Sequence, residues 1–341
     1  MSSLERLVID VMEGKKPGKP LLHVLSYLYL AGVRLRNFGY DANLFKSLSV
    51  SAPVVSVGNI VAGGTGKTPL VKFLAQELAQ SYQVAILSRG YRSEIAKTNQ
   101  VVRLKGAENA RKFGDEPSWL ARELPQVAVW VGKNRSLSAE RAIQEGAQVL
   151  ILDDGMQYRK LRRDTEIVVM DGEDLFGKGY FLPRGFLRDT PRRLKNADCV
   201  VINGAKDHQK VKNALLPYTE APLVFVRMRL SVNIEKKRVG LFCAIGKPEK
   251  FMNSVRESGA EVVATFFKRD HDAFTLEELK TFAKRAKADL LVCTEKDEVK
   301  IPQSFKEELP IVACRGAWEV VAGHDDWQKV IESIKSRIHH V

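Results

Sequence analysis

Short apolar runs alternate with helix-like stretches through the first two thirds of the chain. The runs are rich in valine and isoleucine, and they cover Val54–Val57, Val84–Leu87, Val127–Val131, Val149–Leu152, Ile167–Met170 and Val200–Ile202. Helical patterns lie between several of them, at Lys67–Ala79, Pro117–Glu123 and Ser136–Glu145. Continuous apolar strands separated by helices predict a parallel sheet that is covered on both faces. Ligands of such α/β folds bind at the carboxyl ends of the strands.

A second series of strand and helix patterns begins near Leu223. Its predicted strands are Leu223–Met228, Val239–Ile245, Glu261–Phe267, Leu290–Cys293 and Ile311–Ala313. The stretch before it, Asn203–Glu220, is polar and helix-like. We therefore expect two domains, a larger one over residues 1–222 and a smaller α/β one over 223–341, as the length of the chain also suggests.

The N-terminal region contains an apolar run, Leu21–Val33, that is 13 residues long. A membrane-spanning helix needs about 20 residues. Basic residues flank the run, and Tyr27 and Tyr29 suit a headgroup boundary. The pattern predicts a helix, at about residues 20–36, that lies in a membrane interface and is attracted by anionic lipid. An ordinary core helix is the alternative.

Composition limits the classes of protein that the chain can be. Hydrophobic residues make up 45% and charged residues 28%, which is typical of a folded protein. The net charge of +13 favours anionic partners, such as nucleotides, nucleic acid, acidic lipids or phosphorylated substrates. The four cysteines form no C-x-x-C pair, so we expect neither a disulfide framework nor a zinc site, as fits a reducing cytoplasm.

The segment that follows the first strand has the chemistry of a phosphate-binding loop. It reads V-G-N-I-V-A-G-G-T-G-K-T-P, and its small residues let backbone N–H groups turn toward phosphate oxygens. A helix N-terminus adds further donors, Lys67 can reach the outer phosphates, and the Thr68 hydroxyl can bind Mg²⁺. Val61 stands where the usual pattern has glycine, and a plain glycine-rich turn is the alternative. The predicted nucleotide contacts are Val61, Ala62, Gly63, Gly64, Thr65, Gly66, Lys67 and Thr68.

Two acidic segments are candidates for metal binding and proton transfer. The apolar run at 149–152 ends in Asp153 and Asp154, and a carboxylate there can hold Mg²⁺ opposite Thr68. The alternative is a simple D-D-G turn. In Gly114-Asp115-Glu116-Pro117, a structural interpretation makes Asp115 a helix N-cap and Glu116 a first-turn acid. In a functional one, one carboxylate is a base or orienter for an attacking hydroxyl and the other is a metal-side ligand.

Several other charged segments also follow predicted strands. Arg89 is placed to touch phosphate and Tyr91 to pack against a nucleotide or substrate, although these residues alone favour an exposed Arg-Gly turn. Clustered arginines at 159–163 and 184–193 suit phosphate oxygens, and they lack the interleaved aromatic residues of single-strand nucleic-acid binders. His271 lies between two aspartates, and Thr294-Glu295-Lys296-Asp297 has the spacing of a helix cap.

These motifs, in this order, resemble the tetraacyldisaccharide 4'-kinase family. The resemblance rests on the loop together with S-R-G-Y, G-D-E-P, L-D-D-G-M-Q, the segment Asp171–Gly185 and T-E-K-D. The loop of that family also lacks the first glycine, so Val61 agrees with it. The resemblance implies transfer of the ATP γ-phosphoryl group to the 4'-hydroxyl of a tetraacyldisaccharide 1-phosphate, giving lipid IV-A at the cytoplasmic face of the bacterial inner membrane.

The resemblance also implies roles for individual residues, with ATP and Mg²⁺ as cofactors. Asp115 matches the base and His271 its dyad partner, while Lys67 is expected to act in catalysis. Metal-side residues would be Thr68, Glu116, Asp153 and Asp154; Arg89 and Tyr91 would contact the nucleotide, and Asn59 and Arg184 the lipid substrate. The role of Arg188 stays open, because the segment differs here from the expected L-R-E-P.

The expected partners are an anionic acylated disaccharide lipid and the membrane surface. Neither nucleic acid nor an obligate protein partner is expected. The main alternative is a P-loop switch NTPase that acts on a protein partner, and a nucleic-acid-stimulated ATPase is supported only by the charge.

Overall fold

The computed structural model describes residues 3–91, 93–106, 109–230, 233–246, 248–269 and 272–339. The chain forms two compact units, each made of separate segments. The first comprises residues 1–87, 135–227 and 320–341, and the second comprises 88–134 and 228–319. The chain passes between them inside β8 (Leu223–Leu230) and inside β13 (Gly316–Ala322). The division into domains 1–222 and 223–341 stays a prediction. In the compact units, residues 88–134 belong to the second unit and residues 320–341 to the first.

A parallel sheet forms the centre of the first unit. With β8, its strands are β1 (Val54–Gly58), β2 (Val84–Ser88), β5 (Val149–Asp153), β6 (Thr165–Asp171) and β7 (Cys199–Asn203). Their order is β8-β7-β6-β1-β5-β2, and the pairs from β8 to β5 and from β5 to β2 are parallel. All residues of β1, β2, β5 and β6 are buried, which explains their continuous apolar sequences. The predicted α/β class is confirmed.

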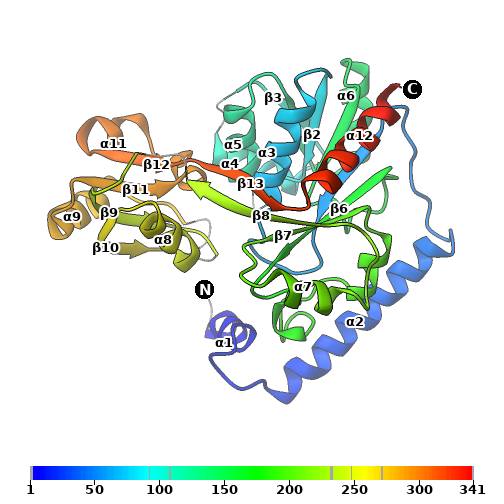
Figure 1. The fold of residues 1–341 in the computed structure, drawn as a ribbon, viewed down its shortest axis with the longest axis horizontal. Helices are drawn as coiled ribbons and strands as arrows, with labels where there is room; N and C mark the ends of the chain where they lie inside the picture. Colours follow the sequence, from blue (N-terminus) through cyan, green and yellow to red (C-terminus); the bar gives the residue numbers. More distant parts are fainter. Residues whose placement is uncertain are drawn as a thin grey trace. The chain divides into compact units, whose positions relative to one another are not determined.

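Helices pack against this sheet on both faces. They are α3 (Lys67–Leu78), α6 (Arg135–Gln144), α7 (His208–Leu215) and α12 (His324–His339), with short 3₁₀ turns at Gly177–Gly179 and Pro191–Asn196. Figure 1 shows α3 and α12 on one side of the strands and α7 on the other. The Phe73 ring of α3 stacks on Trp327 of α12, with 5.8 Å between centroids. On the opposite face, Val211 and Leu215 of α7 join the apolar cluster over β6 and β7.

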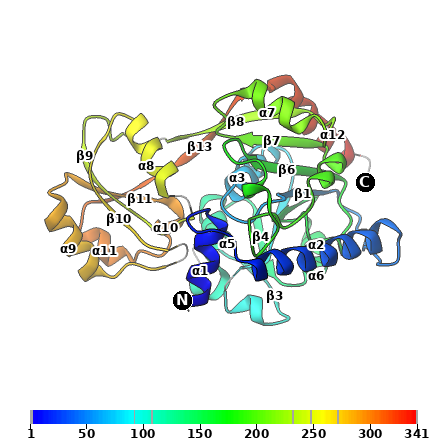
Figure 2. The ribbon, with the colours of Figure 1, turned by 90° about the horizontal axis from the view of Figure 1, so that it is seen from below.

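The N-terminal region forms α1 (Ser3–Met12) and the long helix α2 (Pro20–Asp41), which runs along the outside of the first unit (Figures 1 and 2). The helix α2 begins with Pro20, where no amide donor is required. It extends five residues beyond the predicted end at about residue 36. Its buried residues are few, whereas six large apolar side chains are 40–70% exposed: Leu21, Val24, Leu25, Leu28, Leu35 and Phe38. Among the described helices, none is both long and apolar enough to cross a membrane.

The second unit contains a smaller parallel sheet. Its strands are β9 (Arg238–Cys243), β10 (Glu261–Phe267), β11 (Leu290–Thr294) and β12 (Ile311–Cys314), in the order β10-β9-β11-β12. Its helices here are α8 (Pro248–Glu257), α9 (Leu276–Ala286), α10 (Glu295–Glu298) and α11 (Gln303–Glu308). Phe242, Phe266 and Phe274 pack edge to face beneath α9.

The remaining part of the second unit, residues 88–134, departs from the expected pattern. A short strand, β3 (Val101–Leu104), pairs antiparallel with β4 (Ala128–Gly132). We did not predict β3, because it has only four residues and carries exposed Arg103. A 3₁₀ turn (Ile95–Lys97) and the helices α4 (Ala110–Phe113) and α5 (Asp115–Glu123) complete this region.

We predict that the native cysteines are unreactive. All four are free and buried, and burial raises the pKa of Cys199, Cys243 and Cys314 to about 12. At pH 8 these thiols are therefore protonated as well as shielded. A thiol-reactive dye should label the folded protein negligibly and should label four thiols after unfolding in guanidinium chloride. Rapid labelling of folded protein that keeps its native circular dichroism would contradict the prediction.

Candidate phosphate-binding and catalytic site

The loop between β1 and α3 has a backbone that only glycine adopts easily. Gly63 and Gly66 have φ angles of 110° and 99°, and Gly66 caps the N-terminus of α3. A Cβ atom added at Gly63 or Gly64 would meet no other atom within 4 Å. The loop therefore borders open space beside the first turn of α3, where amide donors point away from the helix. This arrangement fits phosphate oxygens.

Asparagine side chains and a neighbouring segment hold the loop in place. Asn59 Nδ2 donates to Thr65 Oγ1 at 2.9 Å, and Asn203 Nδ2 donates to the Thr65 carbonyl at 3.1 Å. Val61 is buried and forms a β-bridge with Leu187, and the Ala62 amide donates to the Phe186 carbonyl at 2.7 Å. The amide of residue 62 is thus already engaged, and the open part of the loop begins at Gly63.

Thr68 and Asp153 face each other at the ends of α3 and β5. Thr68 Oγ1 donates to Asp153 Oδ1 at 3.5 Å, and both side chains are buried. A hydroxyl and a carboxylate so placed suit Mg²⁺, which usually takes one or two protein oxygens and completes its shell with phosphate and water. Within the described residues no group of three or more His, Cys, Asp or Glu side chains could hold a metal without such additional ligands.

Asp154 has different partners from its neighbour. Lys67 Nζ lies 3.6 Å from Asp154 Oδ1, and the Arg188 guanidinium binds both carboxylate oxygens, with 2.9 Å between Nη1 and Oδ2. Desolvation alone would raise the pKa of Asp154, but Lys67, Arg188 and Arg135 outweigh it and hold that pKa well below its ordinary value. Asp154 therefore stays ionised and fixes the position of Lys67.

Arg188 is the site residue to which the sequence assigned no role. Besides Asp154, its guanidinium donates to the Asn59 side-chain oxygen. It thus joins the end of β1, the turn after β5 and the segment that bridges to Val61. The only sequence signal for this residue is the arginine-rich string around it.

The helix α2 is attached to the segment that carries Arg188. Asp189 is 1% exposed and accepts hydrogen bonds from Arg36 Nη2 and Asn37 Nδ2, both at 2.9 Å. The Tyr29 hydroxyl donates to the Arg188 carbonyl at 3.3 Å. Polar residues of α2 therefore anchor it to the protein, while most of its large apolar residues lie on the exposed side.

In the second unit, the N-terminus of α5 presents two carboxylates. Gly114, with φ 101°, is the N-cap, so Asp115 is the first helical residue and not the cap. Asp115 and Glu116 both lie in the first turn, where the helix dipole favours negative charge. Asp115 Oδ2 lies 3.1 Å from Lys300 Nζ, and Glu116 Oε1 lies 3.6 Å from Lys296 Nζ.

Glycines bring the S-R-G-Y and G-D-E-P motifs together. Gly90 has φ 69°, and a Cβ atom there would lie 2.8 Å from the Phe113 carbonyl. A Cβ atom at Gly114 would in turn lie 3.3 Å from the Gly90 Cα. The turn that carries Arg89 and Tyr91 therefore packs directly on the turn before Asp115. Both side chains are exposed, Tyr91 by 59%, so they are accessible to a ligand.

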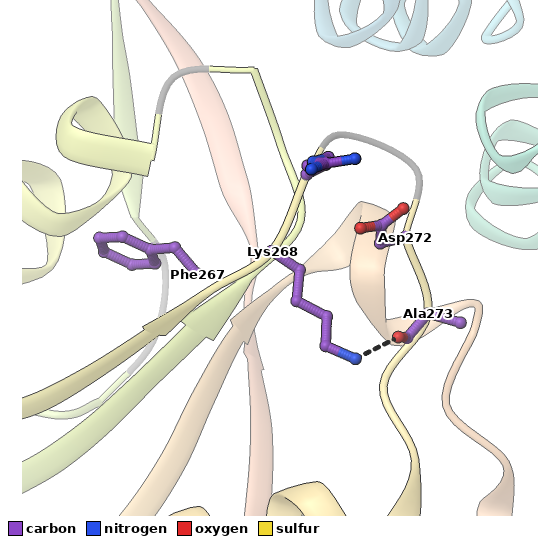
Figure 3. Close-up of a pocket in the computed structure, with 5 residues that line it drawn as sticks. Phe267, Lys268, Asp272 and Ala273 are labelled. Carbon is purple, nitrogen blue, oxygen red and sulfur yellow. Dashed lines mark hydrogen bonds between the residues drawn. The ribbon is translucent and has the colours of Figure 1, made fainter. Parts of the chain in front are cut away.

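The remaining predicted residues lie elsewhere. His271 lies outside the described residues. Near it in the sequence, Phe267, Lys268, Arg269, Asp272 and Ala273 line an open hollow in the second unit (Figure 3). Lys268 Nζ donates there to the Ala273 carbonyl at 2.9 Å (Figure 3). In the first unit, the Arg184 guanidinium stacks over the Tyr180 ring, 3.1 Å from its centroid.

The parallel sheet, the glycine loop at a helix N-terminus and the strand-end carboxylate opposite Thr68 define a P-loop nucleotide-binding protein. A family model described as tetraacyldisaccharide-1-P 4'-kinase matches residues 18–338, and the chain belongs to this family of kinases. The resemblance drawn from the motifs is thereby confirmed.

Known proteins agree with this assignment over most of the chain. The tetraacyldisaccharide 4'-kinase of Chlamydia pneumoniae is 34% identical over 340 residues, covering 93% of this chain and 92% of the relative. That of Syntrophus aciditrophicus (strain SB) is 38% identical over 333 residues and 88% of each chain. The crystal structure of LpxK from Aquifex aeolicus in complex with ATP aligns with a TM-score of 0.73 at 26% identity, covering 92% of this chain and 97% of that one.

We predict that Lys67→Met lowers kcat/KM for ATP at least about 100-fold, because the loop loses the ammonium group that would face the outer phosphates. Steady-state kinetics and calorimetry of nucleotide binding measure the effect. Lys72→Met, which removes a lysine from the same helix but outside the loop, is the matched control and should change little. Near-normal kinetics of folded Lys67→Met would exclude this role.

Proposed function

We propose that this chain transfers the γ-phosphoryl group of ATP to the 4'-hydroxyl of tetraacyldisaccharide 1-phosphate. The single observation that carries the proposal is the open glycine loop at the start of α3, adjoining the Thr68–Asp153 pair. A new P–O bond forms to the 4'-oxygen as the bond between the γ-phosphorus and its bridging oxygen breaks. ADP and lipid IV-A leave as products.

Positioning and charge neutralisation supply most of the catalysis in such a reaction. Phosphoryl transfer passes through a loose transition state, so the protein mainly holds groups in line and balances charge. Lys67 neutralises the outer phosphates, and Asp115 accepts the proton of the attacking hydroxyl. Mg²⁺, when bound, would neutralise charge on the β- and γ-phosphates.

Asp153 is the better candidate than Asp154 for the metal side. Asp153 faces the Thr68 hydroxyl, whereas Asp154 is already paired with Lys67 and Arg188. An acidic residue that accepts a guanidinium on both oxygens has few lone pairs left for a cation. We therefore assign Asp153 and Thr68 to Mg²⁺, and we assign Asp154 to the positioning of Lys67.

The acylated substrate also explains the exposed face of α2. We propose that this face rests on the cytoplasmic surface of the bacterial inner membrane, where an acyl-chain substrate and ATP are both within reach. Leu21, Leu28 and Leu35 recur every seven residues and are 65%, 63% and 70% exposed. A leucine transferred out of water gains about 1.5–3 kcal/mol. Lys15, Lys16, Lys19 and Arg34 add attraction to anionic lipid.

The proposed reaction can be tested directly. Purified protein with ATP, Mg²⁺ and the disaccharide 1-phosphate should yield a product that carries one additional phosphate, resolved by thin-layer chromatography and mass spectrometry. Parallel reactions contain DNA, or a cell extract without the lipid. Turnover that depends on an extract protein, with no lipid product, would support the switch NTPase instead. Turnover that only DNA stimulates would support a nucleic-acid-dependent ATPase.

We further predict that Leu21→Asp/Leu28→Asp/Leu35→Asp abolishes binding to anionic liposomes, because charge replaces the apolar row that would enter the membrane. Flotation measures the binding, and the melting temperature and ATP affinity should stay close to those of the unchanged protein. The matched control, Leu216→Asp, changes an equally exposed leucine (76%) on another helix end. Full flotation of the triple variant would exclude α2 as the membrane contact.

A further inference from the structure

The T-E-K-D segment forms the helix cap that its spacing indicated. Thr294 Oγ1 accepts from the Asp297 amide at 3.2 Å and donates to Asp297 Oδ2 at 2.7 Å. The Ala244 amide donates to the same oxygen at 3.1 Å. Asp297 is 1% exposed, and its Oδ1 has no hydrogen-bond partner among the described residues. The cap therefore accounts for one oxygen of this buried carboxylate and leaves the other to a different group.

Lys300 faces that second oxygen, one helical turn further on. Its Nζ lies 3.7 Å from Asp297 Oδ1 and 3.1 Å from Asp115 Oδ2, and its side chain is 9% exposed. The same Nζ donates to the carbonyl of Asp272 at 3.4 Å. Asp272 directly follows His271 in the sequence and lines the hollow shown in Figure 3. One buried ammonium group thus joins Asp115, the T-E-K-D cap and the loop after β10.

We propose that Lys300 is a positioning residue for phosphoryl transfer, which holds the carboxylate of Asp115 in the orientation that the transfer requires. The inference rests on the proposed role of Asp115 as the base. A carboxylate in the first turn of a helix can rotate about two side-chain bonds, and an ammonium group fixed from the opposite side restricts that rotation. Asp297 fixes Lys300 in turn, since it is itself held by Thr294 and Ala244.

Attachment of α10 to α5 does not depend on Lys300. Arg122 Nη2 of α5 lies 2.8 Å from Glu298 Oε2, and Glu116 pairs with Lys296 at 3.6 Å. Lys306 also binds Glu298, at 2.6 Å. These pairs hold the two helices together without residue 300. Substitution of Lys300 should therefore affect the orientation of Asp115 more than the fold.

Kinetics of Lys300→Met test the proposal. We expect kcat to fall at least about tenfold while the Kd for ATP, measured by calorimetry, stays within about twofold. Lys300→Arg, which keeps the charge, should recover part of the loss. The matched control is Lys280→Met, which breaks the Lys280–Glu308 pair elsewhere in the second unit and should leave kcat unchanged. Folded Lys300→Met with wild-type kcat would overturn the proposal.

Double variants separate a positioning role from a merely structural one. If Lys300 acts through Asp115, Lys300→Met should add little to the loss already caused by Asp115→Asn, whereas independent effects would multiply. Multiplied losses would overturn the proposal. If Lys300→Met unfolds, the double variant Asp297→Asn/Lys300→Met replaces it in the test, because it removes the buried charge together with its partner. A wild-type kcat in that double variant would also overturn the proposal. Absence of lipid kinase activity in the unchanged protein would instead refute the proposed function.

Discussion

The Asp154 carboxylate, at the end of a buried strand, stays ionised because cations face it. In the first unit this charge pairing decides how the site is built. Arg135 binds the carbonyls of Asp153 and Asp154, while Lys67 and Arg188 neutralise the Asp154 side chain. Asp153 faces Thr68, and the negative charge of the neighbouring Asp154 is already neutralised. Without the two arginines, Lys67 alone would oppose the effect of burial on the Asp154 carboxylate.

The same constraint connects the site to the surface of the protein. Arg188 is followed in the chain by Asp189, a buried carboxylate that accepts hydrogen bonds from Arg36 and Asn37 of α2. Breaking a buried ion pair typically costs about 3–5 kcal/mol, because the remaining charge is left unpaired. The inner side of α2 thus carries buried polar anchors, such as Ser26 and Asn37, beside the buried apolar residues Leu22 and Val33. The usual surface helix has a polar outer side, whereas α2 carries a second apolar row there.

Local patterns predicted the framework of the structure well. The apolar runs that became β1, β5 and β7 could be recognised because both faces of a parallel sheet are buried, and the turn at Gly63–Gly66 because few residues adopt its backbone. The short strand β3 could not be recognised, since half of it is polar or partly exposed. Residues such as Arg188 could not be assigned either, because their partners lie far away in the sequence.

The net charge of +13 is also easier to interpret with the structure in view. Arg188, Arg135, Lys300 and Lys296 are bound to carboxylates or carbonyls inside their own unit. These cations do not form a surface that attracts polyanions; they hold individual acidic groups in fixed orientations. The surplus charge by itself therefore did not distinguish a nucleic-acid binder from a kinase. What the structure adds is where the cations stand: the two proposed reactive carboxylate sites, at Asp153–Asp154 and at Asp115–Glu116, are each paired with basic side chains from distant parts of the sequence. Such pairing suits an enzyme that transfers a highly charged group, because the positions of its charges must be set before the substrate binds.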